Sequence, residues 1–180
     1  MNSLEYYYKT IIKYDLINKF SYSNIKKIPE LKKIVLNFGC KSSEIKELAT
    51  SLLALELIIN TNTPIFLTKS KQPNVLLKIR KGAPVGCKVI LKKKTMYDFF
   101  LKLITEILPN LKNFEGINFK KSITNSNFSF TLKNLVTFKE LETYFYLFEK
   151  LPPLNITIIT NTSTKKELFF LINSFKLPLL

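Results

Sequence analysis

The chain has 180 residues, 46% of them hydrophobic, which is enough apolar material for the core of one folded domain. Its 28 lysine and arginine residues outnumber its 13 acidic residues, and the formal net charge is +15. This imbalance favours a polyanionic partner, with nucleic acid first and an anionic membrane surface second. Histidine is absent and only two cysteines are present, so a zinc site with four thiolate or imidazole ligands is excluded.

The number of lysines also has an explanation in base composition. Lysine, asparagine, isoleucine, phenylalanine and tyrosine are all enriched by coding sequences rich in A and T, and Arg80 is the only arginine. The placement of the lysines is therefore better evidence than their number. No stretch reaches the roughly 18 apolar residues of a membrane span, and the N-terminus has no signal or transit pattern. We expect no membrane span and two reduced thiols, Cys40 and Cys87.

The first half of the chain predicts a helix followed by three strands. Residues 4–20 form an amphipathic helix, because apolar residues recur on one side at helical spacing. Alternation with a period of two predicts strands at residues 32–38, 65–68 and 85–91, and the first has one polar face.

A second helix is predicted between the first two strands. Ser42 or Ser43 is its candidate N-cap. The side chains expected to form its buried stripe are Ile45, Leu48, Ala49 and Leu52.

The second half of the chain predicts three helices and two strands. A helix opened by Thr95 and Asp98 ends at Pro109, and residues 110–127 form a long loop. Strands are expected at residues 128–133 and 154–158. Two capping boxes open the remaining helices: Thr137 with Glu140, and Thr164 with Glu167. The class is α+β: one domain over residues 1–180, with a mostly antiparallel sheet, helices packed on one face and a long basic loop between strands two and three.

Two features favour nucleic acid. The polar strand faces offer hydroxyls, amides and a lysine that suit phosphate and ribose, namely Asn37, Lys88, Ser129, Thr131, Asn155 and Thr157. Residues 69–94 carry lysines and Arg80 without one acid, and such a tract repels itself unless an anion binds it. The alternatives are a solvated sheet face and a solvated charge run. Gly82 and Gly86 either allow close backbone approach to a ligand or only shape the loop.

The sequence gives little support for catalysis. Histidine is missing as a general base, and the carboxylates fall at helix caps and on solvated helix faces. Phosphate-binding and nucleophile-elbow motifs are absent. We expect no enzyme, no cofactor and no metal; a carboxylate-metal nuclease is the enzyme class hardest to exclude.

Three motifs in order resemble a known family. Residues 28–39 read IPELKKIVLNFG, residues 78–89 read KIRKGAPVGCKV, and residues 96–100 read MYDFF. They resemble the IPxxxKIxLNxG, KIRxGxPIGCKV and MWEFF segments of the universal large-subunit ribosomal protein that binds 5S rRNA, the bacterial-type L5 family. The resemblance covers essentially the whole chain.

The resemblance implies a structural constituent of the central protuberance that binds 5S rRNA and large-subunit rRNA. It also implies contacts with P-site tRNA and with neighbouring ribosomal proteins, including one of the small-subunit head. The implied rRNA-binding residues are Asn37, Lys33, Lys88, Thr63, Lys92, Ser129 and Thr131. The implied tRNA-facing residues are Lys69, Lys71, Lys78, Arg80, Lys81, Gly82 and Pro84. The competing hypothesis is a basic protein peripheral to an anionic membrane, with the opening helix as its contact.

The chain departs from the family pattern at several positions. Thr63 and Ile90 replace the usual Gln and Thr, Ala83 replaces an aromatic residue, and residues 72–77 lose a basic, glycine-containing pattern. The start of the chain matches the family start. Together with the A/T-type composition, this predicts a mitochondrially encoded member on the mitochondrial ribosome in the matrix; a bacterial cytoplasm or a plastid is the alternative.

Overall fold

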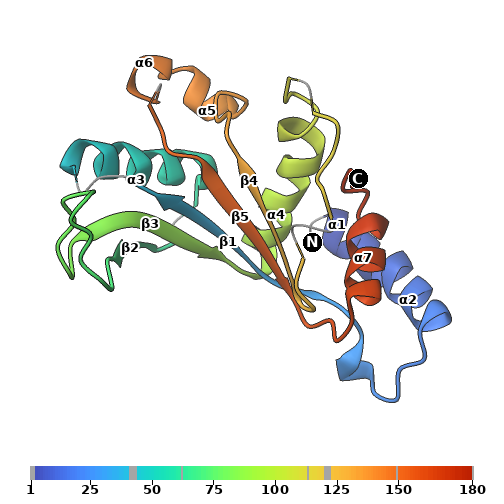
Figure 1. The fold of residues 1–180 in the computed structure, drawn as a ribbon. Coiled ribbons are helices and arrows are strands. Elements are labelled where there is room, and N and C mark those ends of the chain that lie inside the picture. The colour runs from blue at the N-terminus through green and yellow to red at the C-terminus, as the bar shows by residue number, and fades with distance from the viewer. Residues whose placement is uncertain are drawn as a thin grey trace. The chain divides into compact units, whose positions relative to one another are not determined.

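The computed structural model describes residues 3–40, 44–61, 63–112, 114–119, 123–148 and 150–179. Five strands form an antiparallel sheet in the order β2-β3-β1-β5-β4 (Figure 1). The strands are β1 (Leu31–Gly39), β2 (Ile65–Lys69), β3 (Pro84–Leu91), β4 (Asn127–Leu132) and β5 (Leu154–Thr160). The α+β class and all five predicted strands are confirmed.

The opening helix consists of α1 (Ser3–Tyr7), a π-helical turn (Tyr8–Ile12) and α2 (Lys13–Lys19). A 3₁₀ turn (Ile25–Lys27) leads into β1. Later helices are α3 (Ile45–Ile59), α4 (Lys93–Lys102) with a π-helical turn (Leu103–Ile107), α5 (Lys139–Glu142), α6 (Phe145–Phe148) and α7 (Lys165–Ser174).

The chain divides into two compact units. The first contains Met1–Ile34, Leu91–Phe130 and Thr157–Leu180, and the second contains Val35–Ile90 and Thr131–Ile156. Four strands contribute residues to both units, namely β1, β3, β4 and β5. The prediction of one domain stays a prediction.

The first unit is held by aromatic packing and by polar ties. The Phe175 ring stacks with Tyr8 at 6.1 Å between centroids and meets Phe100 edge-on at 5.4 Å. The Tyr8 hydroxyl donates to the Pro29 carbonyl at 2.8 Å, and burial raises the pKa of Tyr8 well above its usual range. The side chain of Asn161 accepts from the Glu30 amide at 2.6 Å, which ties the end of β5 to the start of β1.

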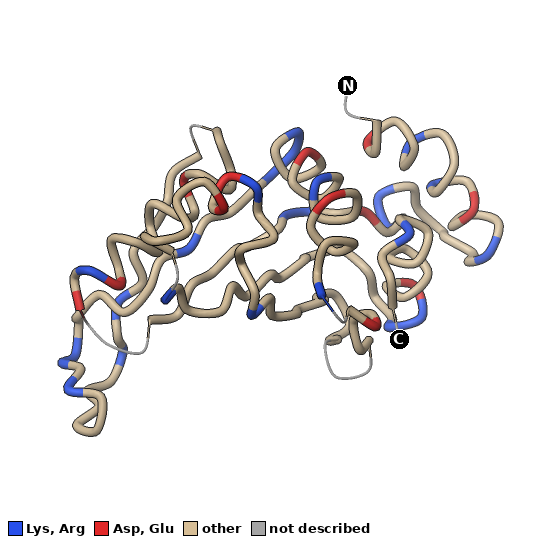
Figure 2. The backbone as a smooth tube through the Cα atoms, turned by 90° about the horizontal axis from the view of Figure 1, so that it is seen from above, with Lys and Arg blue, Asp and Glu red and all other residues tan. Residues whose placement is uncertain are grey.

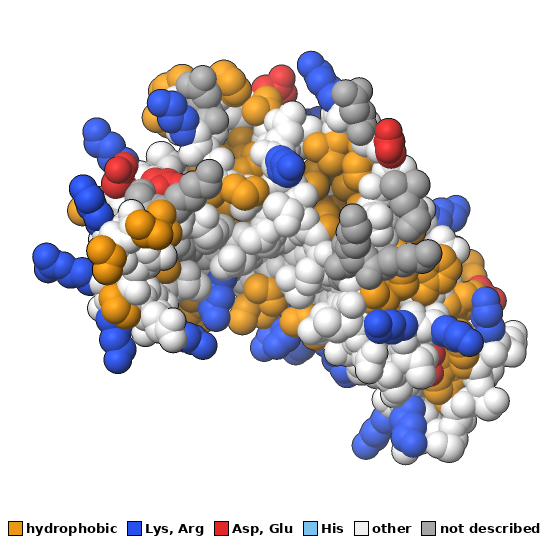
Figure 3. All heavy atoms as spheres, in the orientation of Figure 1, with side chains coloured by type: hydrophobic (Ala, Val, Ile, Leu, Met, Phe, Trp, Pro, Cys, Tyr) orange, Lys and Arg blue, Asp and Glu red, His pale blue; other side chains and the backbone are white. Residues whose placement is uncertain are grey.

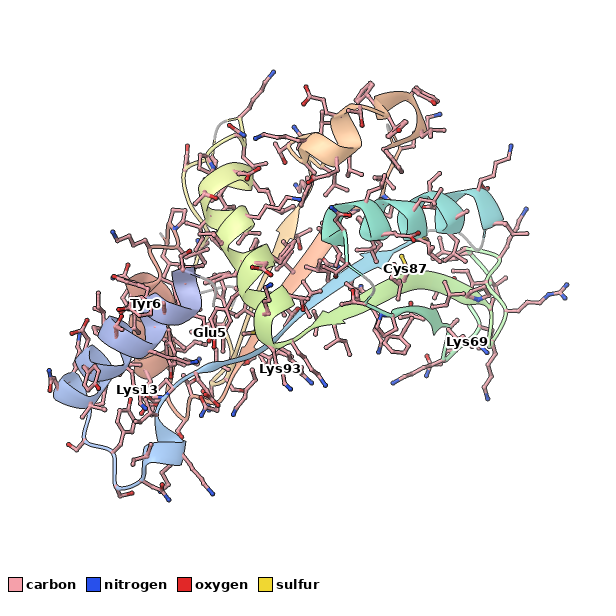
Figure 4. The ribbon with its side chains drawn as sticks, turned by 180° about the vertical axis from the view of Figure 1, so that it is seen from behind. Glu5, Tyr6, Lys13, Lys69, Cys87 and Lys93 are labelled. Atoms are coloured by element: carbon pink, nitrogen blue, oxygen red, sulfur yellow. The ribbon has the colours of Figure 1, made fainter. Side chains whose placement is uncertain are left out.

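In the second unit, α3 packs on the apolar face of the sheet. The sulfur of Cys40 lies 3.6 Å from the Ser51 hydroxyl of α3. Cys87 is fully buried on the side of β3 that α3 covers (Figure 4), and burial raises its pKa to about 12. Both cysteines are free thiols, as predicted.

The stripe predicted for α3 is wrong. Ile45 is 83% exposed and Ala49 is also exposed, while Leu48 and Leu52 are half-buried. The residues that α3 buries are Ser51, Ala54, Leu55 and Ile58. Apolar residues occupy several sides of this helix, so periodicity alone does not identify the buried one. The candidate caps Ser42 and Ser43 lie outside the described residues.

Two predicted helix starts are also wrong. Thr95 lies inside α4 and its hydroxyl donates to the Lys92 carbonyl at 2.8 Å. Thr137 donates to the Asn134 carbonyl at 3.3 Å, while Phe138 occupies the cap of α5. These hydroxyls bond backbone carbonyls of the preceding residues instead of capping the helix.

The capping box of α7 is confirmed. The Thr164 hydroxyl accepts from the Glu167 amide at 3.3 Å, and the Glu167 carboxylate accepts from the Thr164 amide at 3.0 Å.

Candidate nucleic-acid interface

One face of the sheet in the second unit carries polar side chains that solvent reaches. We call Asn37, Lys88, Thr131 and Asn155 the sheet face. Asn37 and Lys88 are half-buried, and Thr131 and Asn155 are exposed. Their strand neighbours Phe38 and Cys87 are buried on the opposite face because side chains alternate along a strand.

Close packing of β1 and β3 supports the sheet face. The Cys40 amide donates to the Val85 carbonyl at 3.0 Å. A Cβ atom on Gly86 would collide with the Phe38 carbonyl oxygen and lie 2.9 Å from the Thr68 hydroxyl. Gly86 lies within β3 and is therefore needed for the close approach of β1, so its role is not that of merely shaping a loop.

A cross-strand hydrogen bond orients part of the sheet face. The Thr131 hydroxyl of β4 donates to the Asn155 side-chain oxygen of β5 at 2.7 Å. Among the described residues, neither the Asn155 amide nitrogen nor the Lys88 ammonium has a hydrogen-bond partner. The face thus presents donors that match phosphate and ribose oxygens.

The other residues implied for rRNA binding lie outside the sheet face as defined above. Thr63 is half-buried ahead of β2, 3.5 Å from the Thr61 hydroxyl. Lys33, Lys92 and Ser129 belong to the first unit. There Lys33 is half-buried, Lys92 is exposed, and the Ser129 hydroxyl donates to the Thr157 hydroxyl at 3.2 Å.

The long loop between β2 and β3 folds back on itself. We call residues 70–83 the basic hairpin. Ser70 donates its amide to Ala83 at 2.8 Å and accepts from the Gly82 amide at 3.0 Å. Asn74 and Ile79 exchange two backbone bonds of 2.9 Å. Gly82 has φ +83°, a conformation that glycine adopts without steric cost.

Sequence reasoning missed the part that Asn74 plays in this hairpin. Its side-chain oxygen accepts from the Leu77 amide at 3.2 Å and closes the tip turn, in which Lys78 has φ +53°. The signal for this turn in the sequence is the Pro73-Asn74 pair, because both residue types favour turns.

The cations implied to face tRNA lie on the hairpin or at its base. Lys69 ends β2, exposed Pro84 begins β3, and the exposed cations between them are Lys71, Lys78, Arg80 and Lys81. None of these five cations forms a salt bridge within the described part of the chain. Figure 2 shows Lys and Arg and no acid along this segment. Its positive charge is therefore uncompensated locally.

Other classes of site find no support among the described residues. No three of their His, Cys, Asp and Glu side chains are grouped to hold a metal ion. None of their helices is long and apolar enough to cross a membrane.

The model of the C-terminus of the ribosomal L5 family matches residues 84–179. The large ribosomal subunit protein uL5m of Reclinomonas americana is 38% identical over 181 residues, covering 99% of this chain and 98% of the relative. Protein uL5 of Blochmanniella floridana is 32% identical over 99% of this chain and 93% of its own length. Protein uL5 of Borreliella afzelii is 34% identical, covering 97% and 95%. The chain therefore belongs to the ribosomal protein L5 family of the large subunit, whose members are structural components and not enzymes.

Proposed function

We propose that this large-subunit protein lies in the central protuberance and binds 5S rRNA through the sheet face. The observation that carries the proposal is a set of donors that solvent reaches, half-buried Lys88 and Asn37 and exposed Asn155, on a face whose opposite side is occupied by α3. Such groups bond phosphate and ribose oxygens and recognise RNA by its contour.

The fixed geometry of the sheet supports selectivity for one folded RNA. Thr131 holds Asn155 by a 2.7 Å bond, so the amide is oriented before RNA arrives. Ordering a side chain in advance lowers the entropy cost of binding. In the first unit, Ser129 with Thr157 and the lysines Lys33 and Lys92 offer further rRNA contacts of the same chemistry.

We also propose that the basic hairpin reaches P-site tRNA. Its backbone bonds keep it folded, and its lysines and Arg80 have no acidic partner among the described residues. Free cations on a folded protrusion suit a phosphate backbone approached from outside. The remaining proposed partners are large-subunit rRNA and neighbouring ribosomal proteins, including one of the small-subunit head.

The proposed location is the mitochondrial ribosome in the matrix. The 38% identity to a mitochondrial uL5m over nearly the full chain supports it. Bacterial uL5 proteins at 32% and 34% identity keep a bacterial cytoplasm as the alternative, with a plastid the other.

Filter binding of the full chain to 5S rRNA and to an unrelated RNA of equal length tests the proposal across a salt series. Affinity for both RNAs should fall with salt, and a preference for 5S rRNA should remain at roughly 0.15 M, where exposed charges are largely screened. Equal affinities at that salt would contradict selective 5S binding. Flotation with anionic liposomes tests the membrane-surface alternative, which requires the chain to float with the lipid in the presence of RNase.

A further inference from the structure

A second surface, in the first unit, forms a pocket of about 520 Å³, and its described lining includes none of the residues proposed to contact rRNA or tRNA. We call it the aromatic pocket. Its lining residues are Lys19, Phe20, Phe119, Lys165, Lys166, Phe169, Phe170 and Asn173. Figure 3 shows hydrophobic side chains with lysines around them over α2 and α7. The volume lies within the range of pockets that hold small organic ligands.

Phenylalanine rings form the floor and walls. The Phe119 and Phe169 rings meet edge-on at 4.8 Å between centroids, and Phe20 meets Phe170 edge-on at 5.8 Å. Phe119 is itself stacked on buried Phe128 at 5.8 Å, so its position is fixed from behind. Phe169 is 44% exposed although it belongs to this cluster. One ring therefore keeps a surface available for a planar partner.

The pocket has a cationic rim, and none of the described residues that line it is acidic. The Lys19 ammonium lies 4.2 Å from the Phe170 ring centroid, which holds this charge at the edge of the pocket. Lys165 and Lys166 occupy the first turn of α7, where a helix dipole disfavours positive charge. The neighbouring carboxylate of Glu167 is engaged in the capping box with Thr164. A bound anion would relieve the repulsion among these three lysines.

We propose that the aromatic pocket binds one unpaired nucleotide of a single-stranded RNA segment, with its base against Phe169 and its phosphates against Lys165, Lys166 and Lys19. Unstacked bases are recognised by aromatic rings beside basic side chains, and every base has a face that stacks. A base inside a duplex is already stacked and does not enter. An apolar protein side chain could occupy the same pocket, but it would give no reason for three lysines and no acid among the described residues that line it.

This inference goes beyond the sheet-face proposal and rests on it only in assuming that the chain works on RNA. The two are separated by choosing different probes. The sheet face is tested with folded 5S rRNA, and the aromatic pocket with a fluorescein-labelled octamer of uridine, which has no secondary structure.

Fluorescence anisotropy of the full chain with this octamer provides the test, at roughly 0.2 M salt to suppress contacts by exposed charges alone. Phe169→Ala leaves the charge unchanged and should weaken octamer binding about tenfold because the base loses its stacking surface. Phe169→Leu should weaken it similarly, while Phe169→Tyr should retain wild-type affinity. Phe145→Ala, at a ring of α6 that is 49% exposed, is the matched control and should have no effect.

The lysines are tested by a double variant, Lys165→Gln with Lys166→Gln, which should also weaken octamer binding. Its control, Lys133→Gln with Lys150→Gln, changes the net charge by the same amount at exposed lysines of the second unit. Ultraviolet crosslinking of the octamer to the wild-type chain should place the crosslinked peptide at Phe169 or Phe119.

Four outcomes overturn the inference: no octamer binding by a chain that binds 5S rRNA, full binding by Phe169→Ala, full binding by Phe169→Leu, or equal losses in the two lysine double variants. Full binding by Phe169→Leu would indicate a purely apolar contact, as expected if the pocket held a protein side chain. If the wild-type chain bound the octamer but did not bind 5S rRNA selectively, the result would contradict the sheet-face proposal and would still support the aromatic pocket as a nucleotide site.

Discussion

The sheet face and the basic hairpin belong to the same unit and both carry cations, yet they differ in how their polar groups are held. On the sheet face, Lys88 is half-buried and Asn155 is fixed by the Thr131 hydroxyl at 2.7 Å. On the hairpin, the cations are exposed and have no salt bridge among the described residues; they are Lys71, Lys78, Arg80 and Lys81.

This difference would allow one small protein to combine selective binding of one RNA, by the sheet face, with general electrostatic attraction to any RNA, by the hairpin. Groups fixed by strand register discriminate between shapes, since a misplaced partner cannot form hydrogen bonds with them. Exposed cations on flexible stems attract any phosphate backbone and act mainly through counterion release. Variants of each region separate the two kinds of attraction.

The largest effect is expected on stability, from a substitution that prevents the close approach of β1 and β3. Gly86→Ala places a Cβ against the Phe38 carbonyl, and overpacking of this kind costs about 1–3 kcal/mol of the free energy of unfolding. Urea unfolding measures the loss. Gly39→Ala is the matched control, because no atom lies within 4 Å of its added Cβ. Equal unfolding midpoints for the two variants would show that β1 and β3 do not need Gly86.

Charge reversal on the sheet face should produce the largest selective loss of binding. Lys88→Glu should weaken 5S rRNA binding roughly 10- to 100-fold, because hydrogen bonds to charged groups contribute about 1.5–3 kcal/mol. Asn37→Ala should produce a smaller loss in the same assay. Lys150→Glu makes the same charge change at an exposed position outside the face. Filter binding in which all three variants lose equal affinity would remove the assignment of the face.

Neutralising the hairpin should change salt dependence more than selectivity. In the double variant Arg80→Gln with Lys81→Gln, the slope of log affinity against log salt should become shallower by about 0.7–0.9 for each phosphate that the hairpin no longer neutralises. Binding to tRNA and to unrelated RNA should weaken by similar factors. A loss confined to 5S rRNA would show that the hairpin, and not the sheet face, selects the RNA.

The smallest effect is expected from removing the Thr131 hydroxyl, which bonds across the strands to Asn155. Thr131→Val keeps the β-branched shape and removes the bond to Asn155, so the unfolding free energy should fall by about 0.2–1 kcal/mol. Affinity for 5S rRNA should also fall, because the Asn155 amide is no longer oriented. Thr143→Val, just after α5, also removes an exposed threonine hydroxyl, one that donates to the Glu140 carbonyl at 3.2 Å, and should leave RNA binding unchanged. Unchanged 5S affinity for Thr131→Val would show that prior orientation contributes nothing.

Local chemistry explains which features of the fold were predictable. The strands followed from alternation, and the α7 cap from Thr164 and Glu167 three residues apart, since both signals involve near neighbours in the chain. The same capping pattern failed at Thr95 and Thr137, where the hydroxyls bond preceding carbonyls. A short motif shows which hydrogen bonds a side chain can form, and the backbone conformation around it determines which of them does form.

By itself, the sequence determined the α+β class, the acid-free tract over residues 69–94 and the motifs shared with the L5 family, because alternation, charge and residue order are properties of the chain alone. Only the tertiary structure decided that α3 buries Ala54, Leu55 and Ile58 rather than Ile45, and that Asn74 closes the hairpin tip. It alone brought Lys19 over Phe170, residues separated by most of the chain. Burial and contact of that kind depend on which surfaces meet when distant segments pack, and no local pattern specifies this.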